Sequence, residues 1–183
     1  FSKVYVNSDD LHLKDLAKKY GFNFFNRQKK LARDTTCIKE VFVDMNNKLR
    51  FHSNTFIWLF YIPLVYKNNN DFKKAIKITE KKKLKSICSF KEAETHPMSC
   101  WYIEENKPSQ FIKNNLCRRQ DFTKAYSHHH YICGFNVKSL KNLNNELIFK
   151  DTYPILLNSN TSKKLIEVDT PNELKKFKKM SKK

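Results

Sequence analysis

The 183 residues provide room for one domain with a small appendage, and a content of 40% hydrophobic and 14% aromatic residues supports a real core and excludes a disordered chain. The 36 lysine and arginine residues exceed the 18 acidic residues and give a net charge of +18. This charge first suggests a nucleic-acid-binding protein. However, few of the basic residues are arginines and the lysines are scattered along the whole chain, which favours a solvated surface.

Short β-branched and aromatic runs alternate with helix-like segments through the first half of the chain. The runs predict strands at residues 3–7, 22–25 and 55–62, and apolar residues at helical spacing predict helices at residues 11–20, 36–49 and 71–82. Gly21 follows the first helix, where a C-terminal cap belongs. The run TFIWLFYI at 55–62 is apolar on both faces, as in a central parallel strand, and Pro63 is expected to end it.

The second half continues the alternation after an irregular stretch. Alternating residues predict strands at residues 84–91, 131–136 and 165–169, with a short helix at 139–143 and an irregular region at 94–121 that holds one possible strand at 101–103. Thr170-Pro171-Asn172-Glu173 is a capping box that opens a final amphipathic helix. The repeated alternation predicts an α/β domain with a mostly parallel sheet and helices on both faces.

Cysteine and glycine usage limits the kinds of site that the chain can hold. The five cysteines form no CxxC pair, so neither a disulfide framework nor a zinc site built from them is expected. These residues contain no signal peptide and no apolar run of membrane-spanning length, and we expect a cytoplasmic protein with neither membrane nor nucleic acid as partner. The two glycines, Gly21 and Gly134, lie outside any glycine-rich phosphate-binding loop.

Acidic residues mark the end of the last predicted strand. Ligands of open α/β sheets bind beyond the carboxyl ends of the strands. Glu167 and Asp169 are two residues apart there, so both carboxylates are expected on one face of the strand. Two such carboxylates suit Mg²⁺, which needs few protein ligands. The alternative is that the aspartate caps the final helix together with Thr170.

Taken in chain order, the motifs resemble those of a known family. They are VNSDD at residues 6–10, NRQKKLARD at 26–34, SICSFKEAETHP at 86–97, RRQDFTKAY at 118–126 and IEVDT at 166–170. This collinear order resembles the acylneuraminate cytidylyltransferases, the CMP-sialic acid synthetases. The resemblance implies a Rossmann-like nucleotidyltransferase fold with a small dimerisation excursion. It also implies a homodimer that uses Mg²⁺ to transfer CMP from CTP to a nine-carbon keto acid sugar, releasing pyrophosphate.

The same resemblance assigns the nucleotide and metal sites. Arg27 matches the arginine that contacts the nucleotide, and the segment with Asp34, Thr36 and Cys37 matches the lining of the base pocket. Asp169 matches the principal magnesium-binding aspartate, which serves catalysis. Glu167 stands where the family usually has a second aspartate, and it is expected to bind the metal as well.

The sugar site is assigned to the RRQD motif and to a histidine run. Arg119 matches the arginine that binds the acidic sugar and is expected to act in catalysis, while Gln120 and Tyr126 are expected to shape the pocket. His129 lies in the run His128-His129-His130, which is interpreted as replacing a family loop and lining the same pocket. In a strand, His128 and His130 would share a face and could hold a metal, but no nearby carboxylate or cysteine is expected to complete a set.

Two departures from the family pattern keep a second hypothesis open. The family opens with a strand and a basic Gly/Ser loop that binds the CTP phosphates, and residues 1–183 begin after it, so we expect this stretch alone to lack normal activity. The family's Gln-Pro-Thr-Ser-Pro-Leu-Arg stretch is replaced by residues 60–65, which have neither its polar groups nor its arginine. We expect one cytidylyltransferase-like domain over residues 1–183; the alternatives are a non-catalytic binding or structural module of the same fold and, third, a basic nucleic-acid module.

Overall fold

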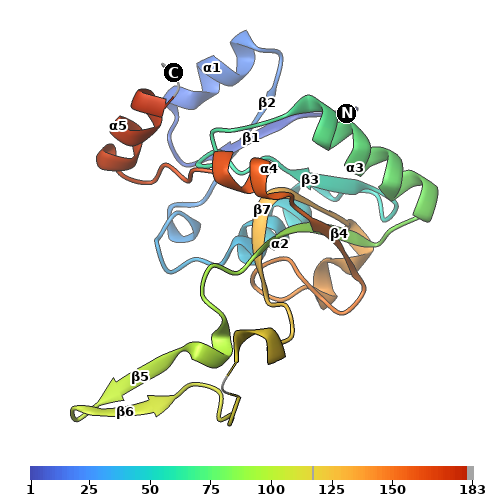
Figure 1. Ribbon diagram of the computed structural model, residues 1–183. Helices are drawn as coiled ribbons and strands as arrows, with labels where there is room; N and C mark the ends of the chain where they lie inside the picture. Colours follow the sequence, from blue (N-terminus) through green and yellow to red (C-terminus); the bar gives the residue numbers. More distant parts are fainter. Residues whose placement is uncertain (117, 181–183) are drawn as a thin grey trace. The chain divides into compact units, whose positions relative to one another are not determined.

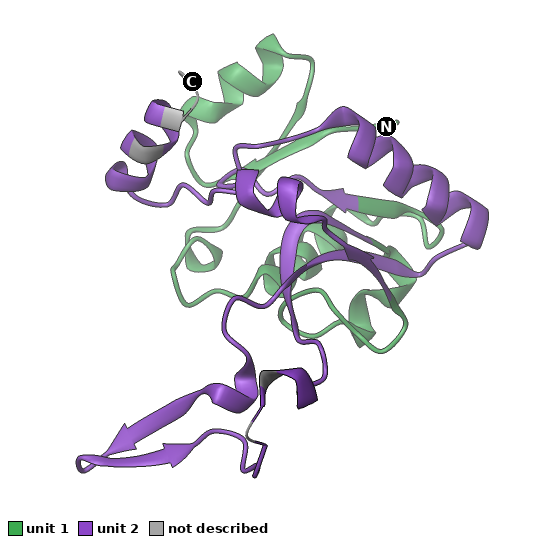
Figure 2. Cartoon of the chain, in the orientation of Figure 1, with its two compact units in different colours: residues 1–57, 135–152 green, residues 58–134, 153–183 purple. Residues whose placement is uncertain are grey.

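The computed structural model describes residues 1–116 and 118–180, without the side chains of residues 119, 176 and 180. It divides into two compact units (Figure 2): unit 1 comprises residues 1–57 and 135–152, and unit 2 comprises residues 58–134 and 153–183. Within the described residues, none of the helices combines the length and the apolar character that crossing a bilayer requires.

Unit 1 begins with a strand–helix–strand motif. β1 (Tyr5–Ser8) pairs in parallel with β2 (Asn23–Asn26), and α1 (His12–Lys19) connects the two strands. The chain reverses after α1 because Gly21 adopts φ +70°, a conformation that suits glycine, which confirms the expected cap. Ser8 lies opposite Asn26, so the carboxyl ends of both strands meet at one edge.

The core of unit 1 lies between α2 (Ile38–Leu49) and the residues that follow Gly134. Phe42 and Met45, one helical turn apart on α2, are both buried. The ring of Phe42 meets the ring of Phe135 edge to face, with centroids 5.1 Å apart, and Phe135 is fully buried. Two short 3₁₀ helices, η1 (Lys29–Leu31) and η4 (Val137–Asn142), complete this unit.

A four-stranded sheet provides the framework of unit 2. In three of its strands, β3, β7 and β8, one end of the strand is assigned to unit 1 and the other end to unit 2. The strand order is β3–β7–β4–β8. Figure 1 labels the first three of these strands. The four strands are β3 (Phe56–Leu59), β7 (Tyr126–Asn136), β4 (Ser86–Glu92) and β8 (Thr152–Leu156). α3 (Asn69–Lys82) packs on β7 through Phe72, whose ring meets that of Tyr131 with centroids 5.7 Å apart. The middle strands carry the deepest residues, and Ile87, Tyr131 and Ile132 are almost completely buried.

Cys37, Cys88, Cys100 and Cys133 carry free thiols. Cys88 of β4 and Cys133 of β7 are fully buried, where cysteine behaves as a small apolar residue. A hydrogen bond with Cys88, together with burial, raises the pKa of the Cys133 thiol well above its ordinary value. Both thiols are therefore part of the packing of unit 2.

Two sequence-based predictions about strands were wrong. β3 was expected to be central, but it lies at one end of the four-strand order, and its residues are only half-buried. Residues 165–169 were expected to form a strand, but only Glu167 forms a single antiparallel bridge, with Leu64. The chain turns into the cap of the last helix directly after this bridge, which leaves no room for a longer ladder. The possible strand at 101–103 is confirmed as β5 (Trp101–Glu104), and it forms an antiparallel hairpin with β6 (Lys107–Gln110), which was not predicted.

The remaining elements refine the sequence-based fold class. Short helices η2 (Pro97–Ser99), η3 (Arg119–Asp121) and α4 (Ser159–Lys164) precede the final helix α5 (Pro171–Met180). The expected capping box is confirmed: the Thr170 hydroxyl accepts a hydrogen bond from the amide of Glu173, whose carboxylate accepts one from the amide of Thr170.

Because strands pair both in parallel and antiparallel, the fold is a mixed α/β fold.

Candidate active site

Arg27 is held at the edge where β1 and β2 end. Its Nε donates to the side-chain oxygen of Asn7 at 2.8 Å, and its Nη2 donates to the Asn7 carbonyl oxygen, also at 2.8 Å. Its backbone amide donates to the carbonyl of Ser8 at 2.9 Å. These bonds fix the plane of the guanidinium without using Nη1, at the sheet edge where α/β proteins bind ligands.

The other predicted nucleotide residues precede α2 in the same unit. Thr36 donates its amide to the carbonyl of Arg33 at 2.9 Å, which forms a turn, and Cys37 is the extended N-terminal cap residue of α2. Asp34 is exposed in this turn. Unit 1 therefore contains all four residues predicted to bind the nucleotide, while the predicted sugar and metal residues belong to unit 2.

A lysine that sequence reasoning missed organises the loop after β3. Lys67 donates from Nζ to the carbonyl oxygens of Tyr61 at 2.9 Å and Leu64 at 2.6 Å, so residues 61–67 curl around its ammonium group. Burial lowers the pKa of Lys67 to about 8. The available signal was its place as the first basic residue after Pro63-Leu64, where the resembled family has an arginine.

This loop anchors the segment with the predicted magnesium ligands. The amide of Val168 donates to the Pro63 carbonyl oxygen at 2.9 Å, next to the bridge between Leu64 and Glu167. The amide of Asp169 donates to the carboxylate of Glu173 at 3.0 Å. The backbone is thus fixed on both sides of Asp169, while the side chains of Glu167 and Asp169 are exposed. Thr170 supplies the side-chain cap of the last helix.

The predicted sugar residues come from separate elements of unit 2. Gln120 is exposed in η3, and Tyr126, the first residue of β7, is 42% exposed. The side chain of Arg119 lies outside the described part of the structure. Within the described part of the chain, no hydrogen bond or ring contact joins Gln120, Tyr126 and His129.

The histidine run lies inside a strand, so the predicted strand start at Tyr131 was too late. That the run lines the sugar pocket stays a prediction. β7 starts at Tyr126, five residues before the apolar run at 131–136 that predicted the strand, because the strand that pairs with β4 includes the polar residues before this run. Ser89 of β4 links the two strands: its hydroxyl donates to the His129 carbonyl oxygen and accepts a bond from the amide of Ile132. The Nδ1 atom of His129 is buried and has no hydrogen-bond partner among the described residues.

We expect His129 to make unit 2 less stable in mild acid. Burial, followed by the positive charges of Lys91, His130, His128 and Lys67, lowers the pKa of His129 to about 4 from the ordinary 6.5. Between these values the unfolded chain binds the proton and the folded chain does not, so the free energy of unfolding falls as the pH falls from about 6.5 to 4. Allowing for solvent screening of this half-exposed ring, the loss is about 1–2 kcal/mol.

Urea unfolding of wild type and His129→Leu at several pH values measures this contribution. The variant lacks the titrating ring, so its advantage over wild type should grow as the pH falls through this range. His12→Gln is the matched control, since His12 is exposed on α1 in the other unit. A difference between His129→Leu and wild type that stays constant with pH would contradict the prediction.

The sequence matches no protein-family model and no curated protein. Among solved structures, it is similar to CMP:2-keto-3-deoxy-manno-octonic acid synthetase complexed with CTP, with a TM-score of 0.59 over 98% of this chain and 80% of the synthetase chain. The chain shares its fold with this synthetase. At 12% identity, the likeness to the synthetase concerns the fold, and it confirms the expected α/β class. A mostly parallel sheet with helices on both faces stays a prediction.

Proposed function

We propose that this chain is the nucleotidyltransferase domain of an enzyme that transfers CMP from CTP to an acidic keto sugar. The observation that carries the proposal is an agreement between two independent sources. The ordered motifs resemble CMP-sialic acid synthetases, and the fold is similar to that of a CMP-sugar synthetase solved with CTP. The fixed arginine at the ends of β1 and β2 supports a nucleotide site at that edge.

In the proposed reaction, the anomeric hydroxyl oxygen of the sugar forms a bond with the α-phosphorus of CTP. The bond between this phosphorus and the oxygen that bridges it to the β-phosphorus breaks, pyrophosphate leaves with that oxygen, and the hydroxyl proton passes to solvent. Phosphoryl transfer of this kind depends mainly on positioning and charge neutralisation. Arg27 is suited to this role because its bonds to Asn7 hold the guanidinium in one plane. Arg119 is proposed to bind the sugar carboxylate.

Glu167 and Asp169 are the residues proposed to hold Mg²⁺. Their exposed carboxylates on a segment fixed by Pro63 and Glu173 match the oxygen ligands and partial hydration that Mg²⁺ prefers. When bound, the ion would neutralise phosphate charge. The chain's own contribution is to keep the backbone of Val168 and Asp169 in place through hydrogen bonds to both neighbouring segments.

We propose a nine-carbon sugar of the sialic acid type as the acceptor. The support for this acceptor is the RRQD motif with Tyr126, which resembles the motif of the sialic acid family. The solved neighbour is named for an octonic acid, and at 12% identity it does not support one acceptor over another. Gln120, Tyr126 and His129 are the residues proposed to contact the sugar. The RRQD motif includes an ion pair of Arg118 with Asp121 at 3.1 Å, which leaves Arg119 as the arginine proposed for the substrate.

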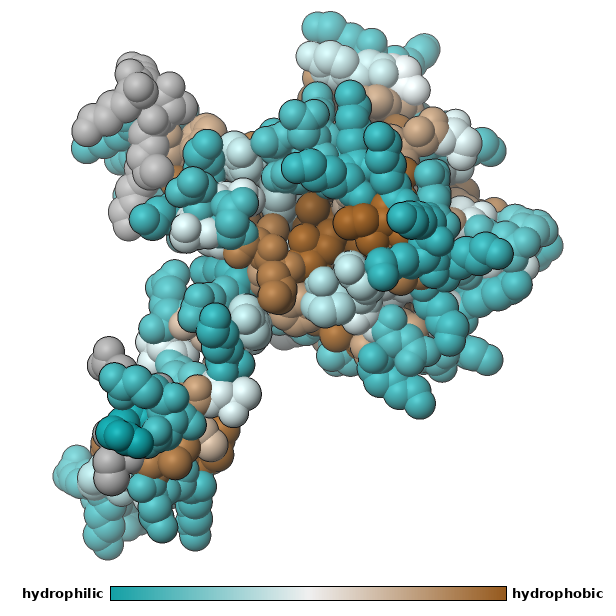
Figure 3. Space-filling view, turned by 45° about the vertical axis from the view of Figure 1, so that its right-hand side comes forward, coloured by the Kyte–Doolittle hydropathy of each residue, from teal (hydrophilic) through white to brown (hydrophobic). Residues whose placement is uncertain are grey.

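We also propose a homodimer formed through the β5–β6 hairpin. Figure 2 shows this hairpin extending away from the sheet of unit 2. Its strands and the next residues expose large apolar side chains, which appear brown at the lower left of Figure 3. Trp101, Ile103 and Phe111 are 53%, 68% and 66% exposed. An apolar projection of this kind favours burial against another subunit, and light scattering of the purified protein checks the molar mass.

The decisive experiment incubates the full-length protein with CTP, Mg²⁺ and single acceptors from a panel of eight- and nine-carbon keto acids. Chromatography for CMP-sugar and release of pyrophosphate are the two readouts. Product with a nine-carbon acid supports the full proposal, and product with an eight-carbon acid alone would replace the proposed acceptor. CTP binding without turnover on any acceptor would favour the non-catalytic alternative, and loss of both binding and turnover would overturn the proposal.

Replacing Arg27 by methionine is expected to weaken CTP binding by about 10- to 100-fold, because charge-assisted bonds from a fixed arginine contribute about 1.5–3 kcal/mol. Calorimetry of CTP binding is the measurement. Arg33→Met is the matched control, since Arg33 is exposed in the neighbouring basic loop and its backbone carbonyl alone takes part in the turn with Thr36. Equal losses for both variants would show a general effect of charge and contradict a specific role of Arg27.

A further inference from the structure

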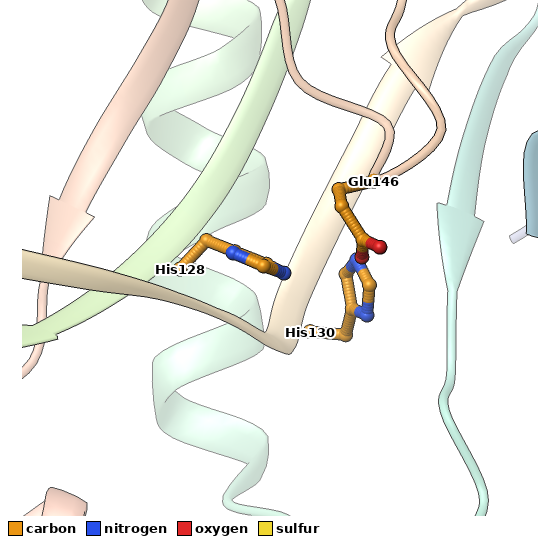
Figure 4. Close-up of side chains that lie close together, drawn as sticks. All are labelled: His128, His130 and Glu146. Atoms are coloured by element: carbon orange, nitrogen blue, oxygen red, sulfur yellow. The ribbon is translucent and has the colours of Figure 1, made fainter. Parts of the chain in front are cut away.

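Two histidines on the outer part of β7 form a pair that the proposed reaction does not need. His128 and His130 are two residues apart in a strand and therefore project from the same face. Figure 4 shows the two imidazoles side by side, and their ring centroids are 5.3 Å apart with a 62° angle between the planes. Glu146, also drawn in Figure 4, belongs to unit 1, whereas both histidines belong to unit 2. The site proposed below therefore uses the two histidines of β7.

The geometry of this pair suits one metal ion. One ring nitrogen of His128 lies within 4.8 Å of one ring nitrogen of His130. In tetrahedral coordination, two zinc–nitrogen bonds of about 2.0–2.1 Å place the two nitrogens about 3.4 Å apart, so rotation of the side chains has to bring them closer together to reach one ion. Pairing of β7 with β4 fixes the backbone of both histidines. Metal binding therefore has to order only their side chains, which lowers its entropic cost.

We propose that His128 and His130 form a binding site for a divalent transition-metal ion such as Zn²⁺, with water or a third ligand completing its coordination. Imidazole nitrogen favours Zn²⁺ and the neighbouring transition metals, whereas Mg²⁺ selects oxygen ligands. The site is therefore chemically distinct from the carboxylates of Glu167 and Asp169. It does not depend on the proposed transferase reaction, and either proposal can fail without the other.

The middle histidine of the run provides an internal control. His129 projects from the opposite face of β7, and its Nδ1 atom is buried. A cation should therefore bind through the outer two imidazoles and leave the middle one without contact.

The ring of His130 connects the site to the loop after β3. It meets the ring of Tyr61 with centroids 5.8 Å apart, and the carbonyl of Tyr61 accepts the bond from Lys67. An ion on His128 and His130 would therefore fix the rotamer of a ring that contacts Tyr61. We expect the fluorescence of the protein or the nuclear magnetic resonance signals of Tyr61 to change when Zn²⁺ binds.

Calorimetric titration of untagged protein with ZnCl₂ at neutral pH tests the proposal. Wild type should bind one ion per chain with saturation, and millimolar MgCl₂ should not displace it. His128→Ala and His130→Ala should each weaken binding by about tenfold or more, because loss of one imidazole ligand removes the chelate. His129→Ala should bind as wild type does, and His96→Ala controls for a histidine elsewhere in unit 2.

The outcomes separate clearly. Loss of binding in the two outer variants alone supports the site. Absence of saturable Zn²⁺ binding to wild type, or an equal loss in His129→Ala, would overturn it. Circular dichroism and thermal melting establish that each variant is folded. Where an alanine variant is not folded, His128→Asn and His130→Asn replace it, since asparagine keeps a polar side chain on the strand and removes the imidazole.

Discussion

Replacing Asp169 by asparagine is expected to reduce the rate of CMP-sugar formation by the full-length protein by about 10³-fold. The carboxylate is the proposed principal ligand of Mg²⁺, and metal stabilisation of phosphate charge contributes several kcal/mol to such reactions. Asparagine has nearly the same shape but no charge, so the backbone bonds of Val168 and Asp169 to their neighbours should persist. Initial rates at increasing Mg²⁺ concentration are the measurement, and the variant should require more Mg²⁺ than wild type.

Thr170→Ala is the matched control for this variant. It removes the hydroxyl that caps the last helix, which should cost about 1 kcal/mol of stability while leaving the carboxylate of Asp169 in place. The two variants therefore separate a metal ligand from a helix cap. If Asp169→Asn lowers stability as Thr170→Ala does and leaves the rate unchanged, the capping interpretation is correct and the proposed metal site is wrong.

Replacing Phe135 by alanine is expected to lower the free energy of unfolding by about 3–5 kcal/mol. The ring is completely buried and packs edge to face against Phe42, so the substitution leaves a cavity and removes an aromatic contact. Urea unfolding followed by circular dichroism measures the change. Because Phe135 and Phe42 both lie in unit 1, signals from that unit should be affected first.

Val43→Ala is the control for packing on the same helix. Val43 is 38% exposed on α2 and the substitution removes less apolar surface, so we expect a change below about 1 kcal/mol. A loss for Phe135→Ala that is no larger than the loss for Val43→Ala would show that the contact between α2 and Phe135 does not contribute to the core as the structure indicates.

Elements with a strong local signal could be predicted from the sequence. The glycine after α1 and the capping box before α5 are local chemistry, and both occur as expected. β8 was missed because Pro154 in the middle of a short run argues against a strand. β6 and the turn that joins it to β5 were missed because the turn residues, Glu105 and Asn106, both adopt positive φ angles without the usual glycine.

The site could be predicted only in part, because its long-range contacts have no local signature. The carbonyl of Pro63 and the amide of Val168 meet although they are far apart in the sequence, and this contact replaced the predicted strand at the end of the chain. Lys67 acts through backbone carbonyls, which no sequence pattern specifies. Motif order indicated Arg27, which the structure fixes at the strand ends through Asn7, and its role in nucleotide binding stays a prediction.

The strand order of the sheet also has a consequence for synthesis of the protein on the ribosome. β7 lies between β3 and β4, although both of these strands precede it in the sequence. β3 must therefore wait for a partner that emerges about 70 residues later, which takes several seconds at roughly 5–20 residues per second. During this interval the apolar run around Phe56–Leu59 lacks the strand that pairs with it in the folded protein. We expect the nascent chain to depend on chaperone binding until Asn136 has left the ribosome.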